Sequence, residues 1–224
     1  MPSTITAADL IIPVKPLGTA KSRLRGAADG GLGAPAAHAR LALALLHDTV
    51  TAVRAAGRVR SLLVIGSDPV VAAELAAVGV EVLPDGPAAG LNAAYTLGAD
   101  TLRRRDPGAV IGALPADLPA LRADELDAAV AAAVAEFAAG AGRAFVADAG
   151  GTGTTLLVAA AGWPLDPRFG VGSAAAHRRS GARQLVGEWP GLRRDVDTAD
   201  DLVRAAELGL GAHTRCVLAP TPHC

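Results

Sequence analysis

The sequence predicts an α/β protein, a three-layer α/β/α sandwich built on a mostly parallel sheet. Two observations support this fold class. Short apolar runs rich in leucine, isoleucine and valine alternate with longer alanine-rich stretches, and such alternation is typical of a parallel sheet with helices on both faces. Glycine, proline or aspartate bounds the apolar runs, as expected of short strands that are buried on both sides.

Strands and helices are expected in strict alternation through the first part of the chain. The strands are predicted at 10–14, 61–66, 80–84 and 109–114, and the helices that follow them at about 35–56, 70–78, 91–105 and 122–138. A crossover helix between two strands of one sheet makes those strands parallel. This part of the chain therefore supplies the parallel portion of the predicted sheet.

The pattern changes after about residue 140. "RAFVAD" and "TTLLVAA" predict two strands joined by the glycine-rich turn "GGTG". The loop "PLDPRFGVGS" then leads to a short helix from Ser173. The segment "LRRDVD" (192–197) has a strand-like pattern, and a further helix is expected from Thr198, with Asp197 or Thr198 as its cap.

We expect one domain, 1–224, with a core at about 9–209. The glycine-rich segment 26–35 is expected to be a mobile loop and 210–224 a loose tail. The most apolar helical stretch carries Asp127 and Glu136, which argues against a membrane span. The N-terminus has no signal-peptide pattern, so a cytoplasmic protein is expected.

Charge and cysteine content exclude several classes of function. The formal net charge of -1 gives no electrostatic basis for binding nucleic acid or an anionic membrane. The two cysteines lie close to the C-terminus, and neither a disulfide framework nor a Cys/His metal spacing is present. An anion-binding site must therefore be a local feature.

The segment "VKPLGTAKSRL" (14–24) is such a feature. It is not a Walker phosphate loop, because Ala20 stands where that motif needs a glycine before the lysine. It does follow the first strand, so it lies at the edge of the sheet where open α/β sheets bind ligands. The cations on this loop are Lys15, Lys21, Arg23 and Arg25. Phosphate binding and a solvated basic turn are both compatible with this pattern.

Two acidic segments are candidates for holding a hard cation. Asp117 follows the fourth strand in a turn bounded by two prolines, and carboxylates are preferred ligands of Mg²⁺. Asp195 and Asp197 are two residues apart, so they share a face if the segment is extended. One of the pair would bind a metal while the other caps the next helix. All three could instead be turn or capping residues.

Two glycine-rich loops offer hydrogen-bond donors. "GGTGTT" (150–155) carries threonine hydroxyls and backbone amides that can bind a phosphate or carboxylate. "RFGVGS" places Gly170, Gly172 and Ser173 at the start of a helix, an end that favours anions. A plain hairpin turn and a plain helix cap are the simpler interpretations of each loop.

Taken in order, six strings resemble one family. They are "VKPLGTAKSRL", "GLNAA", "ADLPAL", "GTGTT", "PRFGVGS" and "DVDTADDL", and they are similar to the phosphoenolpyruvate or 2-phospholactate guanylyltransferases of coenzyme F-420 biosynthesis. The resemblance runs from about 9 to 209 and implies the glycosyltransferase-A-like nucleotidyltransferase fold. It also implies transfer of GMP from GTP to the phosphate of a three-carbon acid, with release of pyrophosphate.

The resemblance assigns roles to residues of this chain. It implies Mg²⁺ as cofactor, held by Asp117 and Asp195, and phosphoenolpyruvate contacts from Thr154, Gly170 and Ser173. The residues implied for nucleotide binding are Lys15, Lys21, Arg23, Gly90 and Asn92, and those implied for catalysis are Lys21, Arg23, Asp117 and Asp195. The substrates would be GTP and phosphoenolpyruvate or 2-phospholactate, and the next enzyme of the pathway is a possible partner.

The residue chemistry agrees with this activity. A phosphate monoester is already anionic, so its attack on a nucleotide needs alignment and charge neutralisation rather than a nucleophile–base pair. Two other hypotheses remain open at this stage. One is another nucleotidyltransferase of the same fold, acting on a sugar phosphate or molybdopterin, and the other is a non-catalytic nucleotide-binding module.

Overall fold

The computed structural model describes residues 7–18, 22–86 and 90–219. A seven-stranded sheet lies at its centre, with the strand order β3-β2-β1-β4-β6-β5-β7. The strands are β1 (Ala8–Pro13), β2 (Val59–Ile65), β3 (Glu81–Leu83), β4 (Val110–Ala113), β5 (Arg143–Ala147), β6 (Thr154–Ala159) and β7 (Arg183–Gln184). Strand β6 is antiparallel to β4 and β5, and the other neighbouring pairs are parallel. The predicted mostly parallel sheet is confirmed.

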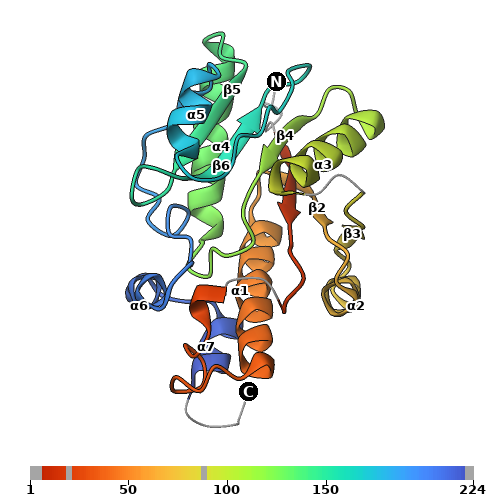
Figure 1. The fold of residues 1–224 in the computed structure, drawn as a ribbon. Helices are drawn as coiled ribbons and strands as arrows, with labels where there is room; N and C mark the ends of the chain where they lie inside the picture. Colours follow the sequence, from red (N-terminus) through yellow and green to blue (C-terminus); the bar gives the residue numbers. More distant parts are fainter. Residues whose placement is uncertain (1–6, 19–21, 87–89, 220–224) are drawn as a thin grey trace.

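Helices cover the sheet on both faces, as Figure 1 shows. The longer ones are α1 (Pro35–Ala55), α2 (Pro69–Ala77), α3 (Leu91–Arg105), α4 (Ala123–Ala138) and α6 (Ala199–Leu208), and the shorter ones are η1 (Ser22–Leu24), α5 (Ser173–Arg179) and α7 (Ala212–Leu218). The four helices predicted before residue 140 begin and end within one residue of these bounds. The prediction of a three-layer α/β/α sandwich is confirmed.

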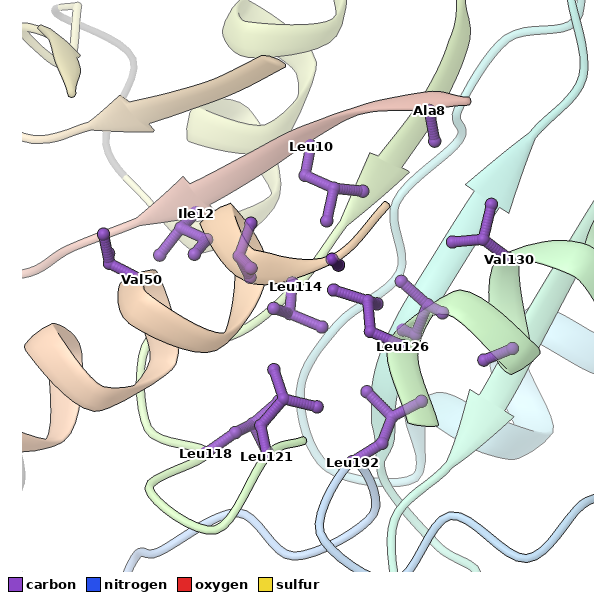
Figure 2. Packing of buried hydrophobic residues seen from close by; sticks show 14 of the residues in the cluster. Ala8, Leu10, Ile12, Val50, Leu114, Leu118, Leu121, Leu126, Val130 and Leu192 are labelled. Atoms are coloured by element: carbon purple, nitrogen blue, oxygen red, sulfur yellow. The ribbon is translucent and has the colours of Figure 1, made fainter. Parts of the chain in front are cut away.

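Alternation along β1 explains the two hydrophobic cores. Leu10 and Ile12 point to one face, where they pack with side chains of α1 and α4, while Ile11 points to the other face and packs with Tyr95 and Leu102 of α3. Figure 2 shows the first core, with side chains of the strand, the two helices and the segment after β4 meeting between them. A strand buried on both faces must be apolar throughout, which is why its sequence reads as a continuous run.

One prediction, a strand at 192–197, is wrong. This segment consists of turns and irregular backbone, because its amides are used elsewhere. The N–H groups of Gly191 and Leu192 donate to the buried carboxylate of Glu125, and that of Val196 donates to the carbonyl of Asp117. Backbone donors used in this way cannot form the ladder of a strand.

The prediction of a loose tail is also wrong for the residues that form α7. This helix lies along α1 in Figure 1, and the α1 carboxylate of Asp48 accepts hydrogen bonds from the N–H groups of His213 and Thr214 at 3.0 and 2.8 Å. Leu210 is buried in a cluster with Leu41 and Leu45. The tail packs because an acidic side chain inside α1 caps it, and no local pattern in the tail reveals that.

The glycine-rich segment 26–35 forms a series of turns before α1 begins. Gly31 N–H donates to the carbonyl of Gly26, and the Asp29 carboxylate accepts from Gly33 and Ala34. These hydrogen bonds hold the pKa of Asp29 below its usual range. The segment contains the expected turns, and its predicted mobility stays a prediction. Within the described residues, no helix combines the length and apolar character needed to cross a membrane.

Candidate active site

A cavity of about 910 Å³ opens where β1 and β4 end and β6 begins. These ends coincide because β6 runs antiparallel to β4. Its lining includes Lys15, Leu17, Arg23, Leu91, Tyr95, Asp117, Asp148, Thr152, Thr154, Phe169, Gly170, Val171, Ser173, Asp195 and Asp197. The structure therefore brings together residues from distant parts of the chain, including most of those singled out from the sequence.

Asp117 is fixed by the buried helix behind it. The Thr49 hydroxyl of α1 accepts the N–H of Leu118 at 2.9 Å and reaches the carbonyl of Ala116 at 3.3 Å. Thr49 is fully buried and Asp117 is only 6% exposed. Because the backbone is held on both sides of Asp117, its carboxylate is kept in a fixed position at the cavity wall.

Asp195 and Asp197 line the same cavity from the segment before α6. Val196 between them is buried, and its N–H donates to the carbonyl of Asp117 at 3.1 Å. Both acids flanking Val196 therefore lie at the cavity, although the segment that carries them is not a strand. Thr198, with Asp201, forms the capping box of α6, which answers the capping question: neither cavity carboxylate is the cap.

Two of the predicted cations reach the cavity. Lys15 and Arg23 line it, and the loop between them is anchored where the Leu17 N–H donates to the Asp68 carboxylate at 2.9 Å. Asp68 also caps α2, so these hydrogen bonds lower its pKa. Lys21 lies outside the described residues. We call the group Lys15, Arg23, Asp117, Asp195 and Asp197 the charged wall.

A second group of lining residues carries hydroxyls and a glycine, and we call it the hydroxyl wall: Thr154, Gly170 and Ser173. Thr154 opens β6 and Ser173 opens α5, and they are 8% and 2% exposed. Gly170 has a φ of 129°, a conformation open to glycine and strained for other residues. Its carbonyl accepts the N–H of Ser173 at 3.1 Å, so the Ser173 hydroxyl, rather than its amide, is the group available to a ligand.

Gly90 and Asn92 were singled out for nucleotide binding, and neither is among the lining residues. Gly90 precedes α3 as its N-cap. The Asn92 side-chain amide donates to the carbonyl of Phe169 at 3.0 Å and accepts its N–H at 2.8 Å. Asn92 thus holds the loop that carries Gly170, and a direct nucleotide contact stays a prediction.

Sequence reasoning missed Asp148, Tyr95 and Phe169, which also line the cavity. The ring of Tyr95 stacks on Phe169 with centroids 4.4 Å apart. Asp148 directly follows the hairpin strand β5, and its carboxylate accepts the N–H of Thr152 at 2.9 Å. A Cβ on Gly153 would lie 2.4 Å from that carboxylate. The signal for Asp148 was its place at the end of a strand, the same signal that identified Asp117.

The donor set suits a hard cation, because carboxylate oxygens are the ligands that Mg²⁺ prefers. Among the described residues, no group of three or more His, Cys, Asp or Glu side chains is already close enough to form a metal centre. Mg²⁺ commonly binds through one or two carboxylates and completes its shell with water and substrate phosphates. Asp117 and Asp195 fit that mode of binding, and a cage made wholly of protein does not fit.

Curated relatives match nearly the whole chain, although no family model matches it. A phosphoenolpyruvate guanylyltransferase of Salinispora arenicola is 53% identical over 205 residues, which cover 92% of this chain and 90% of the relative. A phosphoenolpyruvate guanylyltransferase of Geodermatophilus obscurus is 50% identical over 214 residues, covering 96% and 95%. Both sequence identities far exceed the identity that proteins need in order to share a fold.

Solved structures agree on the fold. A nucleotidyl transferase from Methanothermobacter superposes with a TM-score of 0.61 at 19% identity, over 90% of this chain and 97% of that one. A 4-diphosphocytidyl-2C-methyl-D-erythritol synthase gives a TM-score of 0.58 at 14% identity, over 91% and 99%. These likenesses confirm the predicted nucleotidyltransferase fold. Since identity near one half extends along almost the entire sequence, the chain belongs to the phosphoenolpyruvate guanylyltransferase family.

Proposed function

We propose that this protein transfers GMP from GTP to the phosphate of phosphoenolpyruvate or 2-phospholactate and releases pyrophosphate, as a step of coenzyme F-420 biosynthesis. One observation carries the proposal most directly: a single cavity joins a wall of cations and carboxylates to a wall of hydroxyls. The name of the relatives supports phosphoenolpyruvate as the acceptor. The sequence leaves 2-phospholactate as an alternative.

The reaction forms one bond and breaks one bond. A phosphate oxygen of the acceptor attacks the α-phosphorus of GTP, and the bond from that phosphorus to the oxygen bridging to the β-phosphate breaks. The electron pair leaves with pyrophosphate. Because the attacking oxygen is already anionic at neutral pH, no proton has to be removed from it. The cavity needs to align the two substrates and neutralise charge, which suits the groups that line it.

The charged wall is assigned to GTP and the leaving group. Negative charge builds on pyrophosphate as the bond breaks, so fixed cations stabilise the transition state more than the ground state. Arg23 and Lys15 lie at the cavity, and we assign Lys21 of the same loop to this role. Gly90 and Asn92 are assigned to nucleotide binding, although neither is among the residues that line the cavity.

The hydroxyl wall is assigned to the acceptor. The hydroxyls of Thr154 and Ser173 and the backbone at Gly170 would hold the phosphate and carboxylate of the three-carbon acid. Asp117 and Asp195 would hold Mg²⁺, which when bound supplies positive charge for the phosphates. The small-molecule partners are thus GTP and the acceptor, and the enzyme that uses the product is a further candidate partner.

A pyrophosphate-release assay with a matrix of nucleotides and acceptors tests this function. We expect release with GTP and phosphoenolpyruvate or 2-phospholactate in the presence of Mg²⁺, and a product whose mass equals the acceptor plus GMP less water. Coupling to the next enzyme of the pathway guards against product breakdown. Release only with a sugar phosphate or molybdopterin would assign another nucleotidyltransferase activity. GTP binding without any release would point to a non-catalytic module.

A further inference from the structure

A fully buried histidine joins the two halves of the hydroxyl wall. His177 of α5 is 0% exposed, and both of its ring nitrogens have partners. Nδ1 lies 2.9 Å from the Thr154 hydroxyl oxygen, and Nε2 accepts the backbone N–H of Arg168 at 2.9 Å. One contact reaches the start of β6, and the other reaches the loop that carries Gly170.

The second contact fixes the tautomer of the ring. A backbone N–H can only donate, so Nε2 must present its lone pair to Arg168. A neutral imidazole carries a single ring proton, which must then be on Nδ1. His177 therefore donates from Nδ1–H, and the hydroxyl oxygen of Thr154 accepts.

The ring is neutral under ordinary conditions. Burial lowers the pKa of His177 to about 4, and the nearby Arg168 and Arg143 act in the same direction while Asp166 opposes them. The rings of Phe145 and Phe169 pack against the imidazole at centroid distances of 5.8 and 5.2 Å. A second ring proton would also confront the N–H of Arg168 head on. The donor and acceptor directions of this histidine are thus constant.

The direction of the Thr154 hydroxyl follows. Its oxygen accepts from His177, so its own proton must point to another acceptor. Among the described residues no protein acceptor for that proton is found, and Thr154 lines the cavity. A hydroxyl that accepts one hydrogen bond is polarised to donate a stronger one. Its natural partner is an anionic oxygen in the cavity.

We propose that His177 is a positioning residue that makes the Thr154 hydroxyl an obligate donor to the anionic group of the acceptor. The proposal rests on the proposed function, because that function places the acceptor at the hydroxyl wall. Through Nε2 the same ring sets the distance between Thr154 and the Gly170 loop. The result is preorganisation: the donors are aimed before the substrate arrives, so no rotor freedom is lost on binding.

Two substitutions of His177 test its contacts with Thr154 and Arg168 separately. His177→Gln can accept from Arg168 with its carbonyl but does not reproduce the donor to Thr154, whereas His177→Asn can place an N–H near the position of Nδ1 and gives up Arg168. We expect His177→Gln to raise the acceptor KM about tenfold, the size of one well-made hydrogen bond, with the GTP KM unchanged. His177→Asn should raise the acceptor KM less.

A double-mutant cycle separates positioning from a merely structural role. In a Thr154→Val background the hydroxyl is gone, so His177→Gln should add less than a twofold further change. Independent effects that multiply would overturn the proposal. The cycle is run on acceptor KM and, in parallel, on calorimetric binding of phosphoenolpyruvate to the full chain. Thermal melting of each variant shows whether it folds.

Nitrogen NMR of the wild-type histidine ring keeps the test decisive even if the variants unfold. We expect a neutral ring protonated at Nδ1, and a ring protonated at Nε2 would overturn the proposal. If the binding cycle shows the expected coupling between His177 and Thr154 but the wild-type protein transfers no GMP, the proposed function is wrong and this inference stands. If the protein transfers GMP but the effects of the two substitutions are independent, the proposed function stands and this inference is wrong.

Discussion

The two walls of the cavity are held in place in different ways. The charged wall comes from loops that follow β1 and β4 and from the irregular segment before α6. Backbone N–H groups beside its residues are held there: one donates to the Thr49 hydroxyl, one to the Asp68 carboxylate, and that of Val196 to the carbonyl of Asp117. In the hydroxyl wall, the Thr154 hydroxyl is hydrogen-bonded to the His177 ring, and the Asn92 side chain holds the backbone of the loop that carries Gly170. The charged wall is thus positioned through the backbone beside its residues, whereas in the hydroxyl wall the side chain of Thr154 is itself held.

This difference indicates a division of labour. Charges act mainly on the transition state, where charge changes most, so the charged wall should govern turnover. Neutral hydrogen bonds recognise shape and polarity in the ground state and the transition state alike, so the hydroxyl wall should govern acceptor KM. The following predictions would sharpen this contrast or break it.

The largest effect is expected at the charged wall's carboxylates. Asp117→Asn and Asp195→Asn should each lower kcat on the order of 100-fold or more, because each removes a charge that acts on the transition state. Steady-state kinetics with saturating Mg²⁺ measures this. Asp200→Asn is a matched control, since Asp200 is an exposed acid in the first turn of α6. Near-normal turnover in folded Asp117→Asn would remove the metal assignment.

Next in size are the cations of the first loop. Lys21→Ala and Arg23→Ala should lower turnover with GTP by about tenfold or more, because pyrophosphate gains charge as it leaves. Melting temperature should barely change for Arg23→Ala, since the Arg23 side chain is exposed. Arg25→Ala serves as the control, because Arg25 is exposed on the same loop and is not among the cavity lining. Full activity in both test variants would leave the loop a solvated basic turn.

At the hydroxyl wall, Ser173→Ala should raise the acceptor KM about tenfold and leave the GTP KM unchanged. The hydroxyl is nearly buried and lines the cavity, so its loss removes one hydrogen bond to the acceptor. Initial rates with each substrate varied in turn provide the measurement. An equal rise in both constants would show that Ser173 shapes the whole cavity, which would break the proposed division between the walls.

The smallest effect concerns stability and pH. The pKa of His177 is about 4 in the folded protein and near 6.5 in the unfolded chain, so the folded protein binds the ring proton only at a lower pH. Unfolding therefore takes up a proton between these values, and stability falls as pH drops from 6.5 towards 4. From pH 7 to 5.5 the loss is about 1 kcal/mol. Denaturant unfolding of His177→Gln should lack this loss, and an unchanged pH profile would contradict it.

The sequence predicted the regular half of the fold well. The run around Leu10 and the alanine-rich helix containing Thr49 have strong local patterns, because a strand buried on both faces and a long helix each impose their own periodicity. The cavity acids were also found: Asp117 because it follows a strand, and Asp195 from its spacing to Asp197 and from the family resemblance. Local patterns suffice where local rules determine structure.

What escaped prediction depends on contacts between distant residues. Nothing near His177 shows that its ring will meet Thr154 and Arg168. The segment around Val196 resembled a strand because its pattern alternates, yet its donors are used by Glu125 and by the Asp117 turn. Such pairings are decided by the folded arrangement and have no signature in either partner's own surroundings.

The docking of α7 has a practical consequence for handling the protein. Asp48 caps this helix, and the N–H of Gly211 donates to the carbonyl of Pro119, two residues beyond Asp117. Helix α7 is thus a brace behind the turn that carries Asp117. A protease that clips the chain after α6, or a shortened gene that stops there, would remove this support and leave the turn held by Thr49 and Val196. Loss of activity in a truncated preparation would then arise far from the cut.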